Sequence, residues 1–247
     1  MAHPLGVTVI VPAYNEERTI RALIERVRAV PLELEIVAVN DASRDQTGPL
    51  LDALQAEGLI DRVVHHPQNR GKGAAIRSGI QQASREVIVV QDADLEYDPA
   101  ELPRLLEPIL RGQADAVFGS RFLGSEHRVL FFWHSVGNQV LTLLSNMFTD
   151  LNLTDMETCY KMVRAPLLKS LVLTSDRFGF EPELTARLAQ ARARIWEVPI
   201  SYAGRTYAEG KKIGWRDGVA ALGHIIRFNL FPPKAPDPAL GGSGPRE

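Results

Sequence analysis

The 247-residue chain contains a single cysteine, Cys159, which excludes an internal disulfide framework and a cysteine-based zinc site. Its formal net charge is only -2, so it lacks the global basic field typical of nucleic-acid binding. No apolar run reaches the roughly 20 residues that a membrane-spanning helix needs. No basic leader precedes the first apolar run, so no secretory signal is expected. These absences favour a cytoplasmic protein without a nucleic-acid partner, and they restrict membrane contact to a peripheral one at the inner face.

Short β-branched runs alternate with helical patterns through the first half of the chain. Strands are expected at residues 7–11, 34–39, 62–65, 87–90 and 116–119, and helices at 16–29, 46–57, 73–83 and 99–111. Repeated strand–helix–strand units imply right-handed crossovers and a largely parallel sheet. The strand runs lack apolar–polar alternation, as expected of strands buried on both faces. The predicted fold class is therefore α/β, a Rossmann-like, mostly parallel sheet flanked by helices.

The second half of the chain has fewer strand signals. It predicts helices at 129–151, 181–193 and 215–228, and then a tail rich in proline and glycine. Such a tail has almost nothing to bury. We therefore expect a single domain over residues 1–231 and a flexible tail over 232–247.

Polar side chains gather where the predicted strands end, which is the edge where parallel sheets bind ligands. Asp92 and Asp94, in VIVVQDADLEY, directly follow a buried apolar strand. Two carboxylates there repel each other unless a cation offsets them, and oxygen ligands suit Mg2+ or Mn2+. Glu96 completes the predicted shell. The alternative is an acidic cap for the next helix, but Asp98 already fits that role.

Three further motifs at this edge each allow a binding and a structural interpretation. Asp41 in VNDASRDQT suits a base or ribose, or else an Asx turn before a helix capped by Asp45. VPAYNEE is either a nucleotide-binding loop or a strand followed by a helix capped by Asn15. NRGKGAA places Lys72 and neighbouring backbone N–H groups at the start of a helix, where they suit a phosphate or sugar. It lacks the spacing of a Walker A loop.

The segments VPAYNEE, VNDASRDQT, NRGKGAA, QDADLEY, GSRF and EVPISYAGRTYAEGKK follow one another in this order. Together, over about residues 7–228, they resemble the family 2 glycosyltransferases, and among these most the polyprenyl-phosphate mannose and glucose synthases. The resemblance implies a GT-A fold and transfer of a hexose from a nucleotide-sugar donor, of the GDP-mannose or UDP-glucose type, to a polyprenyl phosphate. The chain departs from the family in reading Glu209, Gly210 and Lys211 where E-S-K is frequent, and in lacking C-terminal transmembrane helices.

The resemblance also implies roles for individual residues. The nucleoside would be held by Pro12, Tyr14, Glu16 and Asp41. The metal and diphosphate would be held by Asp92, Asp94 and Glu96, with Lys72 beside them. The acceptor phosphate would be bound by Arg121. A mobile loop would cover the phosphates with Arg205 and Lys211.

Displacement at the anomeric carbon by an acceptor opposite the leaving diphosphate predicts inversion. A hydroxyl acceptor needs a general base, for which Asp155 and Glu157 in TDMETCYK are candidates, whereas a phosphate acceptor needs none. With a phosphate, these carboxylates would instead orient sugar hydroxyls or basic side chains. The apolar helix at 129–151 either covers the sheet or lies at a membrane surface and receives a prenyl chain.

Two alternative functions stay open at this point. The first is transfer to a hydroxyl acceptor in glycan or glycolipid synthesis. The second is a non-catalytic regulator that binds nucleotide sugars, although the intact pair of Asp92 and Asp94 counts against it. A dinucleotide oxidoreductase is disfavoured because no G-x-G-x-x-G follows the first strand.

Overall fold

The structure is a computed structural model that describes residues 5–124, 128–129, 131–177, 179–204 and 215–231. Among these residues, no helix combines the length and apolar character required to cross a membrane. The predicted loop residues Arg205 and Lys211 and the predicted tail at 232–247 lie outside the described residues.

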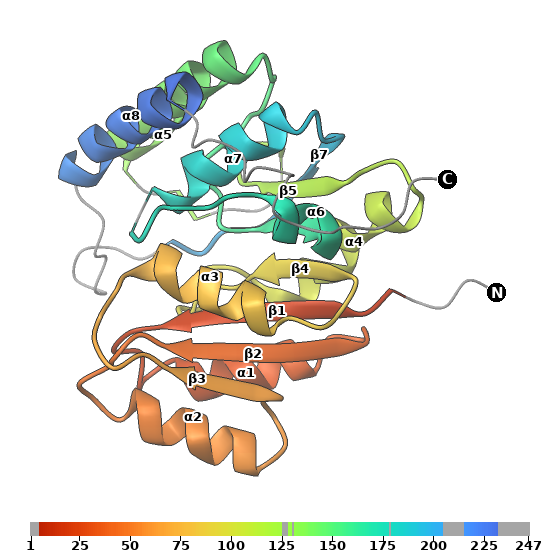
Figure 1. Cartoon of the computed structure of the whole chain (residues 1–247), viewed down its shortest axis with the longest axis vertical. Coiled ribbons are helices and arrows are strands. Elements are labelled where there is room, and N and C mark those ends of the chain that lie inside the picture. Colours follow the sequence, from red (N-terminus) through yellow and green to blue (C-terminus); the bar gives the residue numbers. More distant parts are fainter. Residues whose placement is uncertain (1–4, 125–127, 130, 178, 205–214, 232–247) are drawn as a thin grey trace, which may run out of the picture.

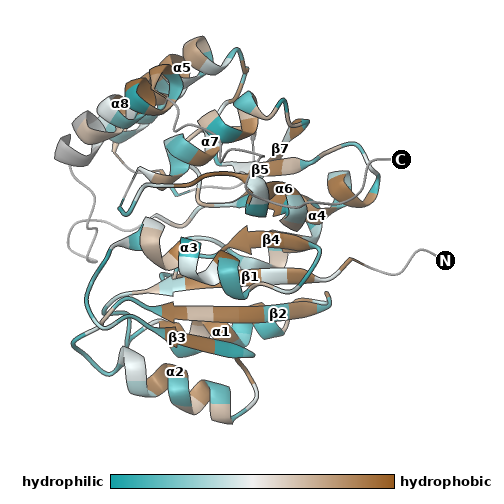
Figure 2. Cartoon of the chain, viewed as in Figure 1, coloured by the Kyte–Doolittle hydropathy of each residue, from teal (hydrophilic) through white to brown (hydrophobic). Residues whose placement is uncertain are grey.

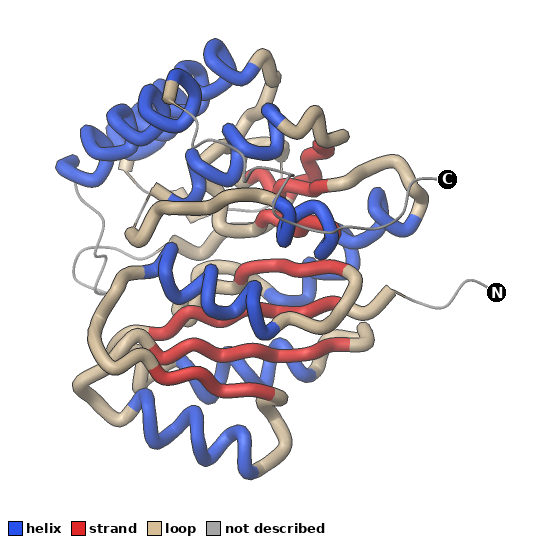
Figure 3. The backbone as a smooth tube through the Cα atoms, in the orientation of Figure 1, coloured by secondary structure: helices blue, strands red, loops and turns tan. Residues whose placement is uncertain are grey.

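A seven-stranded sheet forms the centre of the molecule (Figures 1 and 3). Its strands are β1 (Val7–Ala13), β2 (Leu34–Asn40), β3 (Arg62–His65), β4 (Val87–Val90), β5 (Ala116–Ser120), β6 (Lys161–Arg164) and β7 (Ile195–Pro199). They are ordered β3-β2-β1-β4-β6-β5-β7. Every pair is parallel except those of β6, which runs antiparallel to β4 and β5. The predicted α/β class with a mostly parallel sheet is confirmed.

Helices pack on both faces of the sheet, with α3 in front of β1 and α1 behind the sheet in Figure 1. They are α1 (Ile20–Arg28), α2 (Thr47–Ala56), α3 (Lys72–Gln82), α4 (Leu102–Leu110), α5 (Phe132–Thr149), α6 (Ala165–Ser170), α7 (Phe180–Gln190) and α8 (Trp215–Leu230). A short 3-10 helix, η1 (Pro99–Glu101), precedes α4. As expected, Asp98 caps η1 by accepting a hydrogen bond from the backbone N–H of Ala100 (3.0 Å).

The first half of the chain follows ordinary amphipathic rules. All seven residues of β2 are buried, because helices cover both faces of the central strands. Helix α1 buries Ile20, Leu23, Ile24 and Val27, whose spacing puts them on one face of the helix. Strand β4 and most of β2 are correspondingly brown, that is hydrophobic, in Figure 2.

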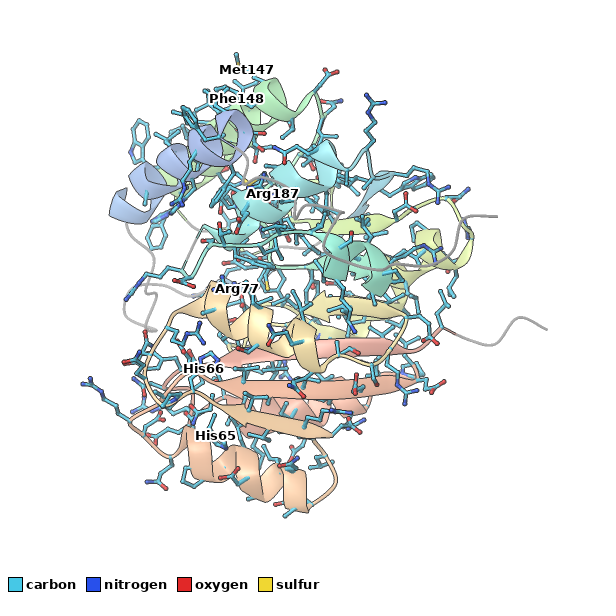
Figure 4. The ribbon with its side chains drawn as sticks, in the orientation of Figure 1. His65, His66, Arg77, Met147, Phe148 and Arg187 are labelled. Atoms are coloured by element: carbon cyan, nitrogen blue, oxygen red, sulfur yellow. The ribbon has the colours of Figure 1, made fainter. Side chains whose placement is uncertain are left out.

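Helix α5 breaks these rules. Only Thr142 and Ser145 of α5 are buried, whereas Trp133 is 77% exposed and Met147 is 72% exposed. Its main contacts are with α7 and α8 rather than with the sheet, and Met147 and Phe148 lie at the outer end of the molecule in Figure 4. The interpretation of this helix as a cover for the sheet is therefore wrong: its two buried side chains are polar, and most of its apolar ones face solvent.

Candidate active site at the carboxyl edge of the sheet

The carboxyl ends of β1, β2, β4 and β5 meet at one edge of the sheet, because these strands run in the same direction. Strand β6 runs the other way, so the segment that precedes it also reaches this edge, between β4 and β5. Topology therefore brings three segments of the chain together: Asp92 to Glu96 after β4, Arg121 after β5, and Asp155 to Cys159 before β6.

The loop after β1 is fixed to the loop after β2. Asn15 has a φ of 55°, a left-handed conformation that asparagine tolerates better than most residues. Its Oδ1 accepts from the backbone N–H of Arg44 (2.8 Å), and its own N–H donates to Ser43 Oγ (3.0 Å). Helix α1 begins after Thr19, so the expected Asn15 cap is wrong. Helix α2 begins after Gln46, although Asp45 accepts from the N–H of Thr47 (3.0 Å).

Three predicted nucleoside-binding residues lie on this first loop or beside it. Pro12 is within β1, Tyr14 directly follows the strand and is 37% exposed, and Glu16 accepts a hydrogen bond from Thr19 Oγ1 (3.2 Å). The exposed Tyr14 ring offers a surface on which a base can stack. Their nucleoside-binding role stays a prediction.

Asp41 is buried and bound within the chain. Its Oδ1 accepts from the N–H of Arg70 (2.9 Å), and its Oδ2 accepts from the N–H of Gly71 (2.7 Å). His66, labelled in Figure 4, places Nδ1 at 2.7 Å from Asp41 Oδ1 and Nε2 at 2.8 Å from Ser78 Oγ. No motif in the sequence singles out His66. Asp41 thereby fixes the turn that delivers Lys72 to the site.

Lys72 bridges two carboxylates at the first position of α3. Its Nζ lies 2.8 Å from Asp92 Oδ1 and 2.9 Å from Glu181 Oε1. Burial by itself lowers the pKa of the Lys72 ammonium, but the negative charge nearby, including that of Asp92 and Glu181, raises that pKa well above its usual value. Lys72 is therefore a fixed positive charge beside the predicted diphosphate site. Glu181 lies in the first turn of α7, and sequence reasoning did not single it out for this site.

Asp94 and Glu96 continue the edge beyond Asp92. The N–H of Glu96 donates to Asp94 Oδ1 (3.2 Å), and Glu96 Oε2 accepts from the hydroxyl of Tyr202 (2.8 Å). Among the described residues, no group of three His, Cys, Asp or Glu side chains has the arrangement of a metal cage. Two carboxylates still fit Mg2+ or Mn2+, because such ions commonly take one or two carboxylates and complete their shell with water and substrate phosphates. Asp92 and Asp94 supply such a pair.

Arg121 is held in place by a buried carboxylate. Its Nε lies 2.6 Å from Asp155 Oδ2 and its Nη2 lies 2.7 Å from Asp155 Oδ1, a bidentate arrangement. Asp155 has no exposed surface, and its Oδ1 also accepts from Asn138 Nδ2 of α5 (3.2 Å). Tyr202 lies under the guanidinium, 5.1 Å from its carbon to the ring centroid. Both oxygens of Asp155 are occupied, which suits positioning of Arg121 better than proton abstraction.

Glu157 and Lys161 belong to the segment that lies between Asp92, after β4, and Arg121, after β5. Lys161 is buried and donates to the carbonyls of Met156 (2.6 Å) and Thr158 (2.9 Å). The Oε1 atom of Glu157 is buried without a hydrogen-bond partner. Burial, followed by the negative charge of Glu181, raises the pKa of Glu157 to about 7 against the opposing effect of Lys161 and Arg121. The structure thus brings all the predicted residues that it describes to one edge of the sheet.

A mostly parallel α/β sheet with paired carboxylates and an ammonium at its carboxyl edge defines the class of GT-A nucleotide-sugar glycosyltransferases. Residues 8–172 match the family described as Glycosyl transferase family 2. The chain belongs to glycosyl transferase family 2.

Two relatives and one solved structure are similar to the chain over most of its length. It is 32% identical over 235 residues to undecaprenyl-phosphate mannosyltransferase of Micrococcus luteus, covering 92% of this chain and 95% of the relative. It is 28% identical to dodecaprenyl-phosphate galacturonate synthase of Rhizobium johnstonii, covering 84% of this chain and 62% of that longer relative. The fold matches the crystal structure of glucosyl-3-phosphoglycerate synthase from Mycobacterium tuberculosis with Mn2+, UDP and glucosyl-3-phosphoglycerate, with a TM-score of 0.71, 21% identity and coverage of 93% of this chain and 81% of that chain.

Proposed function

We propose that the protein is an inverting, metal-dependent hexosyltransferase that moves a sugar from a nucleoside diphosphate to a polyprenyl phosphate, with residues 1–231 as its single catalytic domain. The relatives named above support this acceptor class, since their names specify undecaprenyl and dodecaprenyl phosphates. The observation that carries the proposal is the guanidinium of Arg121, held by a buried carboxylate close to the end of the sheet that carries Asp92 and Lys72. Lys72 therefore provides a positive charge for the donor diphosphate, and Arg121 provides one for the acceptor phosphate.

The donor end of the site comprises Asp92, Asp94, Glu96 and Lys72. The bound Mg2+ or Mn2+ would neutralise charge on the leaving diphosphate. Lys72 adds a fixed ammonium, held in position by Asp92 and Glu181, that stabilises the same developing charge without reorganising. Asp41 contributes through the loop of Arg70 and Gly71 that leads to this lysine. Pro12, Tyr14, Glu16 and the undescribed Arg205 and Lys211 are assigned to the nucleotide sugar on the family pattern.

The acceptor end is built around Arg121. A phosphate is already anionic at neutral pH, so attack on the anomeric carbon does not require a base to remove a proton. The guanidinium needs to align the attacking oxygen, and its bidentate pairing with Asp155 restricts its orientation. Asp155 accordingly acts as a positioning residue.

A membrane surface is the proposed source of the acceptor. Helix α5 contains no Asp, Glu, Lys or Arg and turns large apolar side chains to solvent. On α5 and at the end of α8 the exposed apolar side chains include Phe132, Trp133, Leu143, Met147, Ile226, Leu230 and Phe231. Asn138 on the same helix contacts both Arg121 and Asp155, so this apolar surface and the acceptor-phosphate site share one element. We assign the surface to the cytoplasmic leaflet of a bilayer, where a prenyl chain resides.

Flotation with vesicles of phosphatidylcholine and phosphatidylglycerol tests this membrane contact. The protein should float with anionic vesicles at low salt, and Trp133→Ser with Met147→Ser should abolish flotation without loss of secondary structure. A concentration-dependent dimer that is lost in the double variant, with no flotation of the parent protein, would instead assign the surface to a second copy of the chain.

Turnover of UDP-glucose and GDP-mannose, with and without a short polyprenyl phosphate, tests the proposed function. A lipid-linked hexose should form from one donor only when the polyprenyl phosphate and Mg2+ or Mn2+ are both present. Equal transfer to a sugar hydroxyl, with no effect of the lipid phosphate, would replace the proposal by a transferase with a hydroxyl acceptor.

A further inference from the structure

Glu157 lies where the two ends of the site meet. Strand β6 is between β4 and β5, and Glu157 comes four residues before Lys161, the first residue of β6. Asp92 follows β4 and Arg121 follows β5, so Glu157 reaches the edge between the donor end and the acceptor end. The same segment touches the donor end, because Cys159 Sγ lies 3.7 Å from the carbonyl oxygen of Val90.

Glu157 is partly exposed as a residue, but its Oε1 atom is buried, and it differs in its hydrogen bonds from the buried carboxylates of the described residues. Asp41 accepts from two backbone N–H groups, and Asp155 is paired with Arg121 and Asn138. Glu183 accepts from the N–H of Thr174 (2.9 Å) and from the N–H of Ser175 (2.7 Å). Glu157 Oε1 is equally inaccessible to water and has no partner. Buried polar atoms in folded proteins are nearly always paired, so an unpaired one indicates a group that the protein has not supplied.

Structural pairing with Lys161 does not account for Glu157. The ammonium of Lys161 is directed to the backbone carbonyls of Met156 and Thr158, which satisfies it locally. Burial has the largest effect on the pKa of Glu157 and raises it, Glu181 and Asp155 raise it further, and the positive charges of Lys161 and Arg121 lower it. The ionised form of Glu157 therefore lowers the stability of the folded protein. A destabilising group of this kind is typically retained where it binds a ligand.

We infer that Glu157 binds a hydroxyl of the transferred sugar and thereby selects the donor. Glu157 is partly exposed as a residue, so its carboxylate can accept a hydrogen bond from the sugar hydroxyl, and the sugar thus provides a partner that the folded chain lacks. This inference rests on the proposed function, because it takes the sugar to lie between Asp92 and Arg121. Glu157 thus recognises the donor. It does not act as a base, because a phosphate acceptor has no proton that must be removed.

The first test compares Glu157→Leu with the parent protein on the donor that is turned over and on its deoxy analogues. Loss of one hydrogen bond to a carboxylate should lower kcat/KM by roughly 10- to 100-fold on the full donor. On the analogue that lacks the bound hydroxyl, the same substitution should change kcat/KM by less than about threefold, because the contact is already absent. An equal loss on every analogue would overturn the inference.

The second test separates binding from a structural role by thermal unfolding of Glu157→Gln. Between its usual pKa of 4.5 and its folded pKa of about 7, Glu157 keeps in the folded state a proton that the unfolded chain releases. Its contribution to stability therefore falls as pH rises through this window. Neutral glutamine should raise Tm near pH 8, and the gain should disappear near pH 4.

The matched control is Glu183→Gln, which removes a buried carboxylate whose oxygens are fully bonded and which takes no part in the site. It should lower Tm near pH 8, where Glu157→Gln raises it. A fall in Tm for both variants would show that Glu157 is structural. If the parent protein turns over no donor, calorimetry decides: Glu157→Leu must weaken binding of a nucleotide sugar but not of the nucleoside diphosphate, and equal binding of both by parent and variant overturns the inference.

Discussion

The donor half of the molecule, from β1 to β4, and the acceptor half, from β5 to α8, use opposite patterns of burial. In the first half, α1 turns Leu23 and its apolar neighbours to the sheet. In the second half, α5 turns Thr142 and Ser145 inward and leaves Leu143 60% exposed. The difference teaches that an apolar stripe on a helix does not by itself identify the core. In this fold Asn138 on the polar face of α5 contacts Arg121 and Asp155, and most of the large apolar side chains of the helix are exposed.

The two halves also hold their carboxylates differently. Asp41 in the donor half is bound by backbone N–H groups, which makes it part of a rigid loop. In the acceptor half, Asp155 is bound by a guanidinium and Glu157 Oε1 has no partner. The carboxylate of Asp41 is thus satisfied by the chain itself, whereas Glu157 has an oxygen that the chain leaves unpaired. The variants described next test this difference between the two halves.

Removal of a metal-binding carboxylate should have the largest effect. Asp94→Asn should lower kcat by roughly 1000-fold, because metal binding supplies several kcal/mol of stabilisation to the leaving group. Chelation should abolish transfer, and Mn2+ or Mg2+ should restore it. The control is Asp98→Asn, which keeps a capping side chain at the start of η1 and should leave kcat unchanged. Full activity in excess chelator would show that the donor half works without a metal.

Replacement of the guanidinium that we propose binds the acceptor should have a smaller and more specific effect. Arg121→Lys retains the charge but loses the planar group that pairs with both oxygens of Asp155. KM for the polyprenyl phosphate should rise about 10- to 100-fold, with KM for the donor nearly unchanged. Arg111→Lys, at an exposed position that is 63% accessible, is the control and should change neither constant. A rise in the KM of the donor instead would place Arg121 at the other end of the site.

Leu143→Ala should have the smallest effect, and its comparison with Leu23→Ala gives the most direct test of the orientation of α5. Leu23→Ala removes a fully buried side chain of α1 and should cost about 2–5 kcal/mol in the free energy of unfolding. Leu143→Ala removes one that is 60% exposed and should change that free energy by less than about 0.5 kcal/mol. Chemical denaturation measures both. An equal loss of unfolding free energy in the two variants would show that α5 is part of the core.

The sequence predicted the donor half well because its rules are local. The strand from Arg62 to His65 has the predicted bounds, and Asp98 has the predicted capping role, since burial on both faces and cap chemistry act within a few residues. Strands β6 and β7 were not predicted. Strand β6 has four residues and is antiparallel in a parallel sheet, so its place is set by distant partners. The pairings of Lys72 with Glu181 and of Arg121 with Asp155 also join distant segments, which sequence spacing does not reveal.

The most direct test of the account compares two acceptors that differ only in the phosphate: a short polyprenyl phosphate and the corresponding polyprenol. The parent protein should transfer hexose to the phosphate and not measurably to the alcohol, because Arg121 is expected to recognise an anion and Asp155, whose two oxygens are bound by Arg121 and Asn138, is not available to activate a hydroxyl. Across the neutral pH range, transfer should therefore be measurable with the polyprenyl phosphate and not with the polyprenol. Comparable transfer to the polyprenol, lost in Asp155→Asn, would contradict the account and make Asp155 a general base.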